Sequence, residues 1–295
     1  MPRLIRWLSL AFLCFSGLAQ AATPLPVAAS FSILGDLVQQ VGGERVSVFR
    51  LVGPDEDAHV FQPTPADIAR ISRTRLFFVN GLGLEGWLTR LQQAANYQGT
   101  VVTVNQAGNT LVMDEDGKRV TDPHAWQDPA RTKAMVGVIN AALCKADAAG
   151  CGYYQQRTTA YQKQLDDLAS WATSEFNKVP PQKRVILTSH DAFGYLGARF
   201  GIKILAPQGV STDAEPSAKD VGKLINQIKQ SGIHAVFMEN ISNPKMVQQI
   251  AAETGSKPGD KLFSDALSKD GVADTYLKMY RHNVTTLVAG MAQNR

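Results

Sequence analysis

The sequence predicts an α/β protein of two lobes, each with a mostly parallel sheet flanked by helices, joined by one long helix. Short apolar runs of strand length alternate with stretches of helical spacing over residues 23–150, and the same alternation returns over residues 181–295. Between them lies a long polar segment, residues 153–177, which contains neither glycine nor proline. Alternating strands and helices are typical of parallel sheets that are covered by helices on both faces.

The elements of the first lobe follow from apolar spacing and from turn residues. Strands are expected over residues 27–31, 46–52, 76–79 and 101–104. Helices are expected over residues 33–41, from residue 64, over residues 84–95 and from residue 129. Asp116 and Gly117 predict a hairpin turn between residues 111–113 and 119–120.

The linking helix is expected within residues 151–180. An approximately helical stripe of apolar side chains consists of Tyr154, Tyr161, Leu165, Leu168 and Trp171. Two prolines, at residues 180 and 181, end this helix. In the second lobe, strands are expected over residues 185–188, 202–205 and 233–238, with helices after residues 217 and 243 and over residues 272–291.

Residues 1–22 are predicted to be a signal peptide and not part of the fold. Two arginines precede a short apolar stretch at residues 7–15, and small residues mark a cleavage point after Ala21 or Ala22. The apolar stretch is too short to span a bilayer as a stable helix. Cys14 follows a leucine, whereas a lipoprotein signal has a small residue there. We therefore expect a soluble protein in a bacterial periplasm; the alternative is an uncleaved membrane anchor.

The charge of the chain excludes some classes of partner. Without residues 1–22 the chain has 28 basic and 26 acidic residues. A net charge near +2 is too small to indicate binding to nucleic acid or to a membrane surface.

Two cysteines, Cys144 and Cys151, remain after cleavage. In an oxidising compartment we expect them to form a disulfide that closes a short loop. Their other role would be metal ligation, which is disfavoured because no histidine lies near them and their spacing is not that of a zinc finger.

Three of the five histidines, His59, His124 and His190, lie in loops bracketed by Pro and Asp or directly after predicted strands. In open α/β sheets, ligands bind beyond the carboxyl ends of the strands. Neutral imidazole is a common ligand for zinc and related ions. Asp265, which follows an apolar run, is the candidate for a fourth ligand. Two candidates from each lobe predict an ion held in the cleft between the lobes.

Each candidate also has a simpler interpretation. His59 or His124 alone would be a surface loop histidine, and Asp265 could cap a helix. His190 next to Asp191 suggests a catalytic base, but neighbours in sequence have poor geometry for that role. His234 and His282 are expected to be structural.

Two glutamates, Glu215 and Glu239, are candidates for orienting a ligand histidine from behind, as carboxylates often do. The simpler interpretation is that they cap the turns at Ser217 and Asn243.

Several segments together make the chain resemble the metal-binding solute-binding proteins of bacterial ABC importers, which capture zinc or manganese. These segments are residues 29–33, 53–59, 63–68, 80–85, 122–126, 189–193, 215–217 and 263–265. The resemblance covers essentially the whole mature chain. It implies two α/β lobes joined by one long rigid helix, metal ligands at His59, His124, His190 and Asp265, and a monomer that delivers metal to an inner-membrane ABC permease. A periplasmic metallochaperone is a further expected partner.

The resemblance also bears on the metal. Family members that carry manganese or iron often have glutamate where this chain has His190. Three nitrogens and one oxygen suit four-coordinate Zn²⁺, whereas manganese takes more oxygen ligands. We therefore expect zinc, with manganese or iron as the alternative. Many zinc carriers have a long His- and Asp-rich loop, whereas residues 113–118 of this chain contain no histidine.

Two other functions compete with metal capture. A catalytic zinc usually keeps three protein ligands and a water, but here a fourth ligand is available and no His-Glu-x-x-His sequence occurs. The role of surface adhesin belongs to lipid-anchored relatives, and this chain lacks the lipid-attachment signal. We therefore expect a binding protein and not an enzyme.

Overall fold

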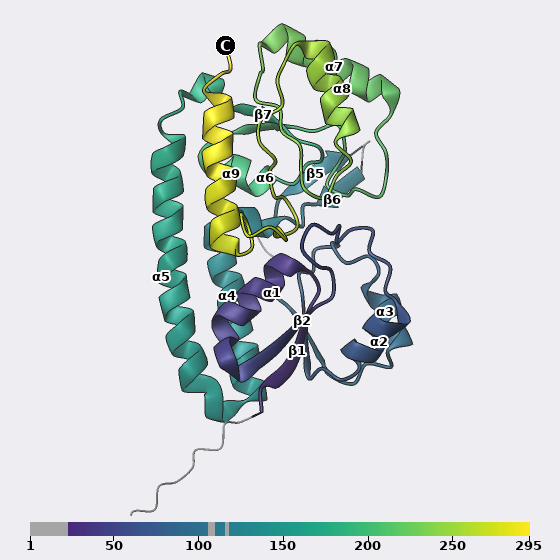
Figure 1. The fold of residues 1–295 in the computed structure, drawn as a ribbon, viewed down its shortest axis with the longest axis vertical. Helices are drawn as coiled ribbons and strands as arrows, with labels where there is room; N and C mark the ends of the chain where they lie inside the picture. The colour runs from purple at the N-terminus through teal and green to yellow at the C-terminus, as the bar shows by residue number, and fades with distance from the viewer. Residues whose placement is uncertain (1–22, 106–109, 116–117) are drawn as a thin grey trace, which may run out of the picture.

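The computed structural model describes residues 23–105, 110–115 and 118–295 and has the predicted two-lobed α/β architecture (Figure 1). The elements before the long helix are β1 (Leu25–Ala29), α1 (Ser32–Gly42), β2 (Val46–Arg50), α2 (Pro65–Ile71), β3 (Leu76–Val79), α3 (Leu88–Ala94), β4 (Thr100–Thr103), β5 (Val112–Glu115), β6 (Lys118–Thr121) and α4 (Pro129–Ala146). The long helix is α5 (Cys151–Phe176), and the elements after it are β7 (Val185–Leu187), α6 (Gly194–Phe200), β8 (Lys203–Leu205), α7 (Ala218–Ser231), α8 (Lys245–Thr254) and α9 (Tyr276–Met291). The predicted signal peptide lies outside the described residues.

The sheet of the first lobe has four parallel strands in the order β2-β1-β3-β4. Helices α1 and α4 lie on one side of it, and α2 and α3 lie on the other (Figure 1). The apolar run of β3 is buried along its whole length, as expected for a strand covered on both faces. Because the strands are parallel, the loops that follow them emerge at one edge of the sheet.

Helix α5 confirms the predicted long helix. Its 26 residues would extend about 39 Å at the usual rise per residue. It runs beside both lobes and packs on α1, α4 and α9 (Figure 1). Its buried side chains are Tyr154, Thr158, Tyr161, Leu165, Leu168, Ala172 and Phe176. None of the helices in the described part of the chain combines the length and the apolar character needed to cross a membrane.

The second lobe has a smaller sheet than the sequence predicts. Strands β7 and β8 pair in parallel, and the expected strand over residues 233–238 forms only an isolated bridge between Val236 and Leu187. The prediction of a full strand was wrong because the side chain of Asn294 binds the backbone N–H groups of His234 and Ala235 at 2.7 and 2.9 Å. These groups are therefore directed toward the end of the chain and not toward a sheet.

The buried apolar side chains form two clusters. The larger one continues from the first sheet through α5 and α9 into the second lobe. The smaller one lies under α7 and α8 and includes Leu187, Ile228 and Ile250. The lobes therefore share one core, and α7 and α8 pack around a core of their own.

The junction of α4 and α5 contains the predicted disulfide between Cys144 and Cys151. Inside this short loop, the Asp147 carboxylate accepts hydrogen bonds from the Arg45 guanidinium at 2.8 Å and from the Tyr154 hydroxyl at 2.7 Å. The disulfide loop thereby holds the start of α5 against the first lobe.

The predicted hairpin is formed by β5 and β6, which pair in an antiparallel register from Val112 opposite Thr121. Its turn, residues 116–117, lies outside the described residues. The Tyr195 hydroxyl of α6 accepts the N–H of Leu111 at 3.1 Å and donates to the carbonyl of Asp122 at 3.0 Å. The chain that leads to His124 is therefore attached to the second lobe.

Candidate metal centre

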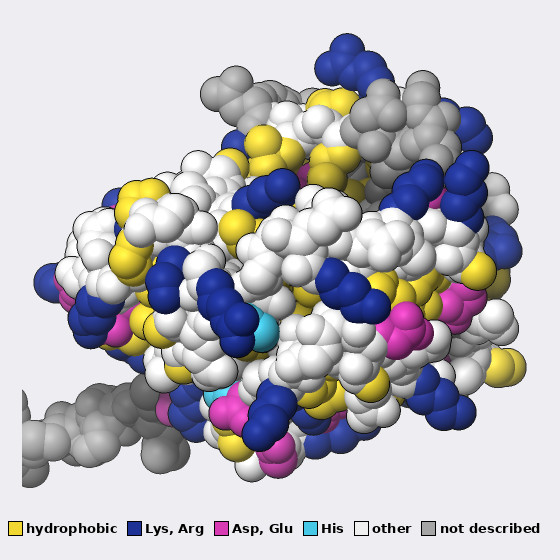
Figure 2. Space-filling model, turned by 90° about the horizontal axis from the view of Figure 1, so that it is seen from above, with side chains coloured by type: hydrophobic (Ala, Val, Ile, Leu, Met, Phe, Trp, Pro, Cys, Tyr) yellow, Lys and Arg dark blue, Asp and Glu magenta, His cyan; other side chains and the backbone are white. Residues whose placement is uncertain are grey.

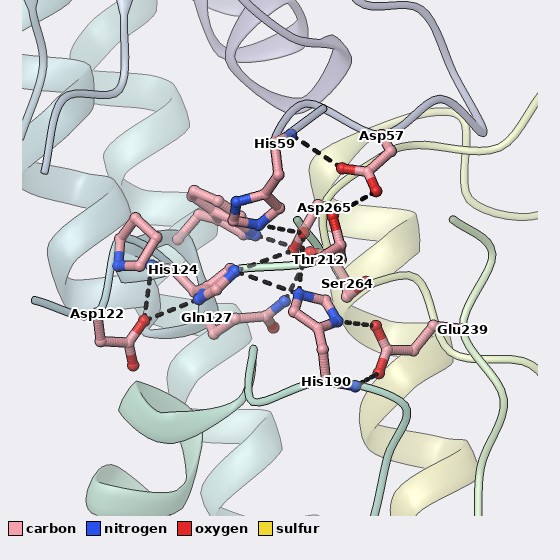
Figure 3. A network of polar contacts seen from close by, with 12 residues as sticks. Asp57, His59, Asp122, His124, Gln127, His190, Thr212, Glu239, Ser264 and Asp265 are labelled. Atoms are coloured by element: carbon pink, nitrogen blue, oxygen red, sulfur yellow. Dashed lines mark hydrogen bonds and ion pairs between the residues drawn. The ribbon is translucent and has the colours of Figure 1, made fainter. Parts of the chain in front are cut away.

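The structure brings together His59, His124, His190 and Asp265, with one potential ligand atom from each inside a span of 4.8 Å (Figure 3). The Nε2 atoms of His59 and His190 lie 3.2 and 3.1 Å from Oδ2 of Asp265, and Nε2 of His124 lies 3.5 Å from Oδ1. Ligand atoms bound tetrahedrally to zinc at about 2.0–2.1 Å are separated by roughly 3.3 Å. The cluster therefore has the size of one metal site.

Because the four side chains of this cluster are buried, the metal-free cluster carries a free-energy cost. His124, His190 and Asp265 are fully buried, and His59 is 7% exposed. Oδ1 of Asp265 is buried and accepts no hydrogen bond within the described part of the chain. It lies 3.5 Å from Nε2 of His124, and a buried carboxylate oxygen without a hydrogen bond is unfavourable, so a cation at the centre would compensate it.

The backbone of His59 and that of His124 are fixed by the same kind of side-chain-to-backbone hydrogen bond. In each case an aspartate two residues earlier accepts the backbone N–H of the histidine: Asp57 for His59 and Asp122 for His124, both at 2.9 Å. Such a side-chain-to-backbone turn fixes the loop from which the imidazole projects. Asp122 was not among the predicted site residues, although the repeated Asp-x-His pattern is the signal that identifies it.

Asp122 and Glu239 also contact the imidazoles directly. Oδ1 of Asp122 lies 2.8 Å from Nδ1 of His124, and Oε2 of Glu239 lies 2.6 Å from Nδ1 of His190. The other oxygen of Glu239 accepts the N–H groups of Ser189 and His190 at 2.7 and 3.0 Å. A carboxylate at Nδ1 favours the tautomer that leaves Nε2 free, so both rings present Nε2 to the cluster (Figure 3).

The charged groups of the cluster change the pKa values of His124, His190 and Asp265. Burial lowers the pKa of His124, but Asp265 and Asp122 outweigh burial and raise it to about 9. For His190, burial is likewise outweighed by Glu239 and Asp265, which raise its pKa well above the usual range. Burial raises the pKa of Asp265, and the facing histidines reverse this and hold it well below its ordinary value. Without metal, the centre therefore retains protons that a cation must displace.

The chain matches the family described as zinc-uptake complex component A, periplasmic, over residues 27–290. The chain belongs to this zinc-uptake component A family. It is 31% identical over 280 residues to the manganese-binding lipoprotein MntA of Halalkalibacterium halodurans, with 94% of this chain and 92% of that protein covered. It is 30% identical over 276 residues to the zinc-binding protein TroA of Treponema pallidum, with 90% and 89% covered. A solved structure of that periplasmic zinc-binding protein matches with a TM-score of 0.86, 30% identity and coverage of 92% of this chain and 100% of the other.

Membership of the zinc-uptake component A family establishes the general activity. The family consists of solute-binding proteins that capture metal for an ABC permease, and its members are not enzymes. The expectations of metal capture and of a two-lobed fold with a long α5 are confirmed. Relatives of similar identity are named for manganese and for zinc, so the choice of metal must be argued from the centre itself.

The segment that contains Asp265 belongs to the second lobe by sequence but is attached to both lobes. The carbonyl of Ser264 accepts hydrogen bonds from the side chains of Trp126 and Gln127, both at 2.8 Å. The N–H of Leu267 donates to the Ser32 hydroxyl at 3.0 Å. In the second lobe, the Asn283 side chain accepts the N–H of Phe263 at 2.9 Å and donates to its carbonyl at 2.7 Å, so both lobes hold the segment of Asp265.

The remaining predicted residues lie away from the four-residue cluster. Glu215 is exposed and lines a groove beside α7 and α8, so the structure does not bring it to a ligand histidine. His234 is near Asn294, and the His282 ring contacts the carbonyl of Lys261 at 2.8 Å.

A buried glutamate supports the His124 loop from the first lobe. The Glu85 carboxylate accepts hydrogen bonds from the Ser30 hydroxyl and from the N–H groups of Asn80 and Gly81 at 2.7–3.0 Å, and burial raises its pKa. The Asn80 side chain in turn donates to the carbonyl of Pro123 at 3.0 Å. These bonds bend the chain at residues 80–87, so α3 begins later than the sequence predicts.

Proposed function

We propose that this protein captures Zn²⁺ in the periplasm with His59, His124, His190 and Asp265 and delivers it to an inner-membrane ABC permease. The observation that carries the proposal is the convergence of three imidazoles and one carboxylate within 4.8 Å in a buried position. The ion is the cargo of the protein, so the site must both hold it and release it.

The charges around the centre support a divalent cation. Three carboxylates, Asp265, Asp122 and Glu239, contact the three imidazoles. When the imidazoles are neutral, the group carries three negative charges, and a divalent ion removes two of them. The protons that the histidines hold in the metal-free state leave for solvent as the ion binds.

The donor set favours zinc. Three nitrogens and one oxygen at these distances match a closed four-coordinate zinc site. One observation favours the alternative of a manganese or iron carrier, which is that both oxygens of Asp265 face the histidines. A carboxylate that binds through both oxygens would give five donors, and manganese accepts more oxygen ligands than zinc does.

Elemental analysis of the protein purified from the periplasm tests the proposal, followed by calorimetric competition between Zn²⁺ and Mn²⁺. We expect one ion per chain and tighter binding of zinc. His124→Ala should weaken zinc binding by tens-fold or more, since it removes a ligand together with the Nδ1 contact of Asp122. The matched control, His282→Ala, should bind like the wild type. Unchanged binding in the first variant would remove His124 from the ligand set, and a wild-type chain without metal would refute the proposal.

Export is part of the same proposal. The signal peptide would be cleaved near Ala21 or Ala22, and the protein would work as a monomer with the permease and a periplasmic metallochaperone as partners. Lys and Arg side chains are spread among acidic and uncharged ones on the face seen in Figure 2, in keeping with the small net charge. Amino-terminal sequencing of the secreted protein checks the cleavage site.

A further inference from the structure

The Asp57 carboxylate connects the loop of His59 to the second lobe. One oxygen, Oδ1, accepts the backbone N–H of His59 at 2.9 Å. The other oxygen, Oδ2, accepts the hydroxyl of Thr212 at 2.7 Å. Thr212 lies in the segment that precedes α7, so a single carboxylate joins a candidate ligand of the first lobe to the α7 side of the second (Figure 3).

Asp57 and Thr212 both line a groove beside α7 and α8. His59 is the one member of the four-residue cluster with measurable exposure, at 7%. The groove has a volume of about 600 Å³ and is lined by Asp57, Ser189 and Thr212 together with side chains of α7 and α8. Ser189 directly precedes His190 in the sequence, and Asp57 lies two residues before His59. The bond between Asp57 and Thr212 therefore lies between the groove and the cluster.

Residues 208–209 pair with the loop of His190, where the N–H of Asp191 donates to the carbonyl of Gly209 at 3.0 Å, and Thr212 lies beyond this pairing in the segment that leads into α7. Helices α7 and α8 pack around the smaller apolar cluster, which is separate from the main core. Asp265, in contrast, lies in a segment that Trp126 and Gln127 attach to the first lobe. A displacement of residues 212–217 together with α7 would break the hydrogen bond of Thr212 and leave both the pairing of residues 208–209 with the His190 loop and the bonds of the Asp265 segment to Trp126 and Gln127 in place.

We propose that the hydrogen bond from Thr212 to Asp57 is a clasp that keeps the groove side of the metal centre closed. Asp57 and Thr212 are thus positioning residues that set how fast a bound ion leaves. The inference rests on the proposed function, because it requires an ion at the four-residue cluster. When Thr212 withdraws, Asp57 is free to rotate, the His59 loop loses its backbone cap, and His59 can turn away from the ion.

The test measures release of Zn²⁺ from the loaded full chain into excess chelator by stopped flow. Thr212→Val removes the hydroxyl at nearly constant volume and should release the ion roughly tenfold faster, the scale expected for loss of a hydrogen bond to a charged group. The association rate should change much less, because the clasp closes after the ion has entered. Thr212→Ser retains the hydroxyl and should restore slow release. Thr212→Ala provides a second deletion of the hydroxyl should the valine variant be poorly folded.

Thr254→Val is the matched control. The Thr254 hydroxyl also donates a hydrogen bond within the second lobe, to the carbonyl of Ile250 at 2.8 Å, but it does not reach the first lobe. This variant should release zinc like the wild type. The proposal would be overturned if Thr212→Val and Thr212→Ala both released zinc at the wild-type rate. It would also be overturned if Thr254→Val increased the release rate as much as Thr212→Val does. Failure of the proposed function is distinguishable, because the wild-type chain would then bind no ion before any variant is compared.

Discussion

At the scale of single residues, the centre depends on the carboxylates behind its imidazoles. Asp122 and Glu239 each contact the Nδ1 of a histidine whose Nε2 faces Asp265. Such partners orient the ring and increase its basicity, which strengthens its bond to a metal. The same basicity strengthens its bond to a proton, so the carboxylates determine how metal and protons compete.

Metal affinity should depend on pH up to unusually high values. An imidazole with an ordinary pKa of about 6.5 would compete with metal only in acid. Asp265 and Asp122 overcome the effect of burial and raise the pKa of His124 to about 9. Because metal needs the deprotonated ring, affinity should rise roughly tenfold per pH unit for each proton displaced, until the pH passes that pKa. Calorimetry at pH 6.5, 7.5 and 8.5 measures this slope.

Asp122→Asn provides the control for this pH dependence. The amide oxygen can still accept the N–H of His124, but the negative charge that raises the imidazole pKa is gone. The variant should bind zinc more weakly, and its affinity should level off at a lower pH. Equal wild-type affinity at all three pH values would contradict the role assigned to these charges.

At the scale of elements, α5 and its amino-terminal junction hold the first lobe to the rest of the molecule. The disulfide between Cys144 and Cys151 closes a loop whose Asp147 accepts hydrogen bonds from Arg45 and Tyr154. This junction lies at the far end of α5 from the second lobe (Figure 1). Loss of the disulfide at this junction should therefore lower the free energy of unfolding and leave metal binding unchanged.

The double substitution of Cys144 and Cys151 by serine should lower the free energy of unfolding by about 2–3 kcal/mol, since a short closed loop restricts the unfolded chain. Urea denaturation of the variant, and of the wild type with and without reductant, measures this loss. Zinc affinity should stay unchanged. A variant as stable as the wild type would show that the hydrogen bonds of Asp147 hold the junction without the disulfide.

At the scale of the whole molecule, buried charge and a shared core link metal binding to folding. The main apolar cluster joins the first sheet, α5 and α9, while α7 and α8 pack separately. Four potential ligands from four distant segments meet inside this arrangement. The unfolded chain cannot present them together, so a bound ion stabilises the folded state alone.

Zinc should therefore raise the melting temperature of the metal-free protein. At a free zinc concentration one hundred times the dissociation constant, the expected stabilisation is about 2.7 kcal/mol. Scanning calorimetry of chelator-treated protein with increasing zinc measures the shift. His282→Ala should show the full shift and His124→Ala little of it. A melting temperature independent of zinc would exclude binding to the folded state.

Local patterns were sufficient for much of this molecule. Apolar spacing predicted α5 and the strands of the first sheet, because helices and buried parallel strands need regular side-chain periods. The positions of His59, His124 and His190 in loops near predicted strands indicated that these side chains would meet, and the structure brings them together. The export signal favoured the disulfide. Each of these inferences depends on residues that are close together in the chain.

Tertiary structure decided what depends on partners far apart in sequence. The strand expected at residues 233–238 is reduced because Asn294, about sixty residues later, binds its first N–H groups. Glu239, and not Glu215, reaches His190 because residues 49 positions apart are brought together by the second lobe. Thr212 and Asp57 are 155 positions apart. The sequence alone determined which residues were available for metal chemistry, and long-range packing determined which of them meet and which support them.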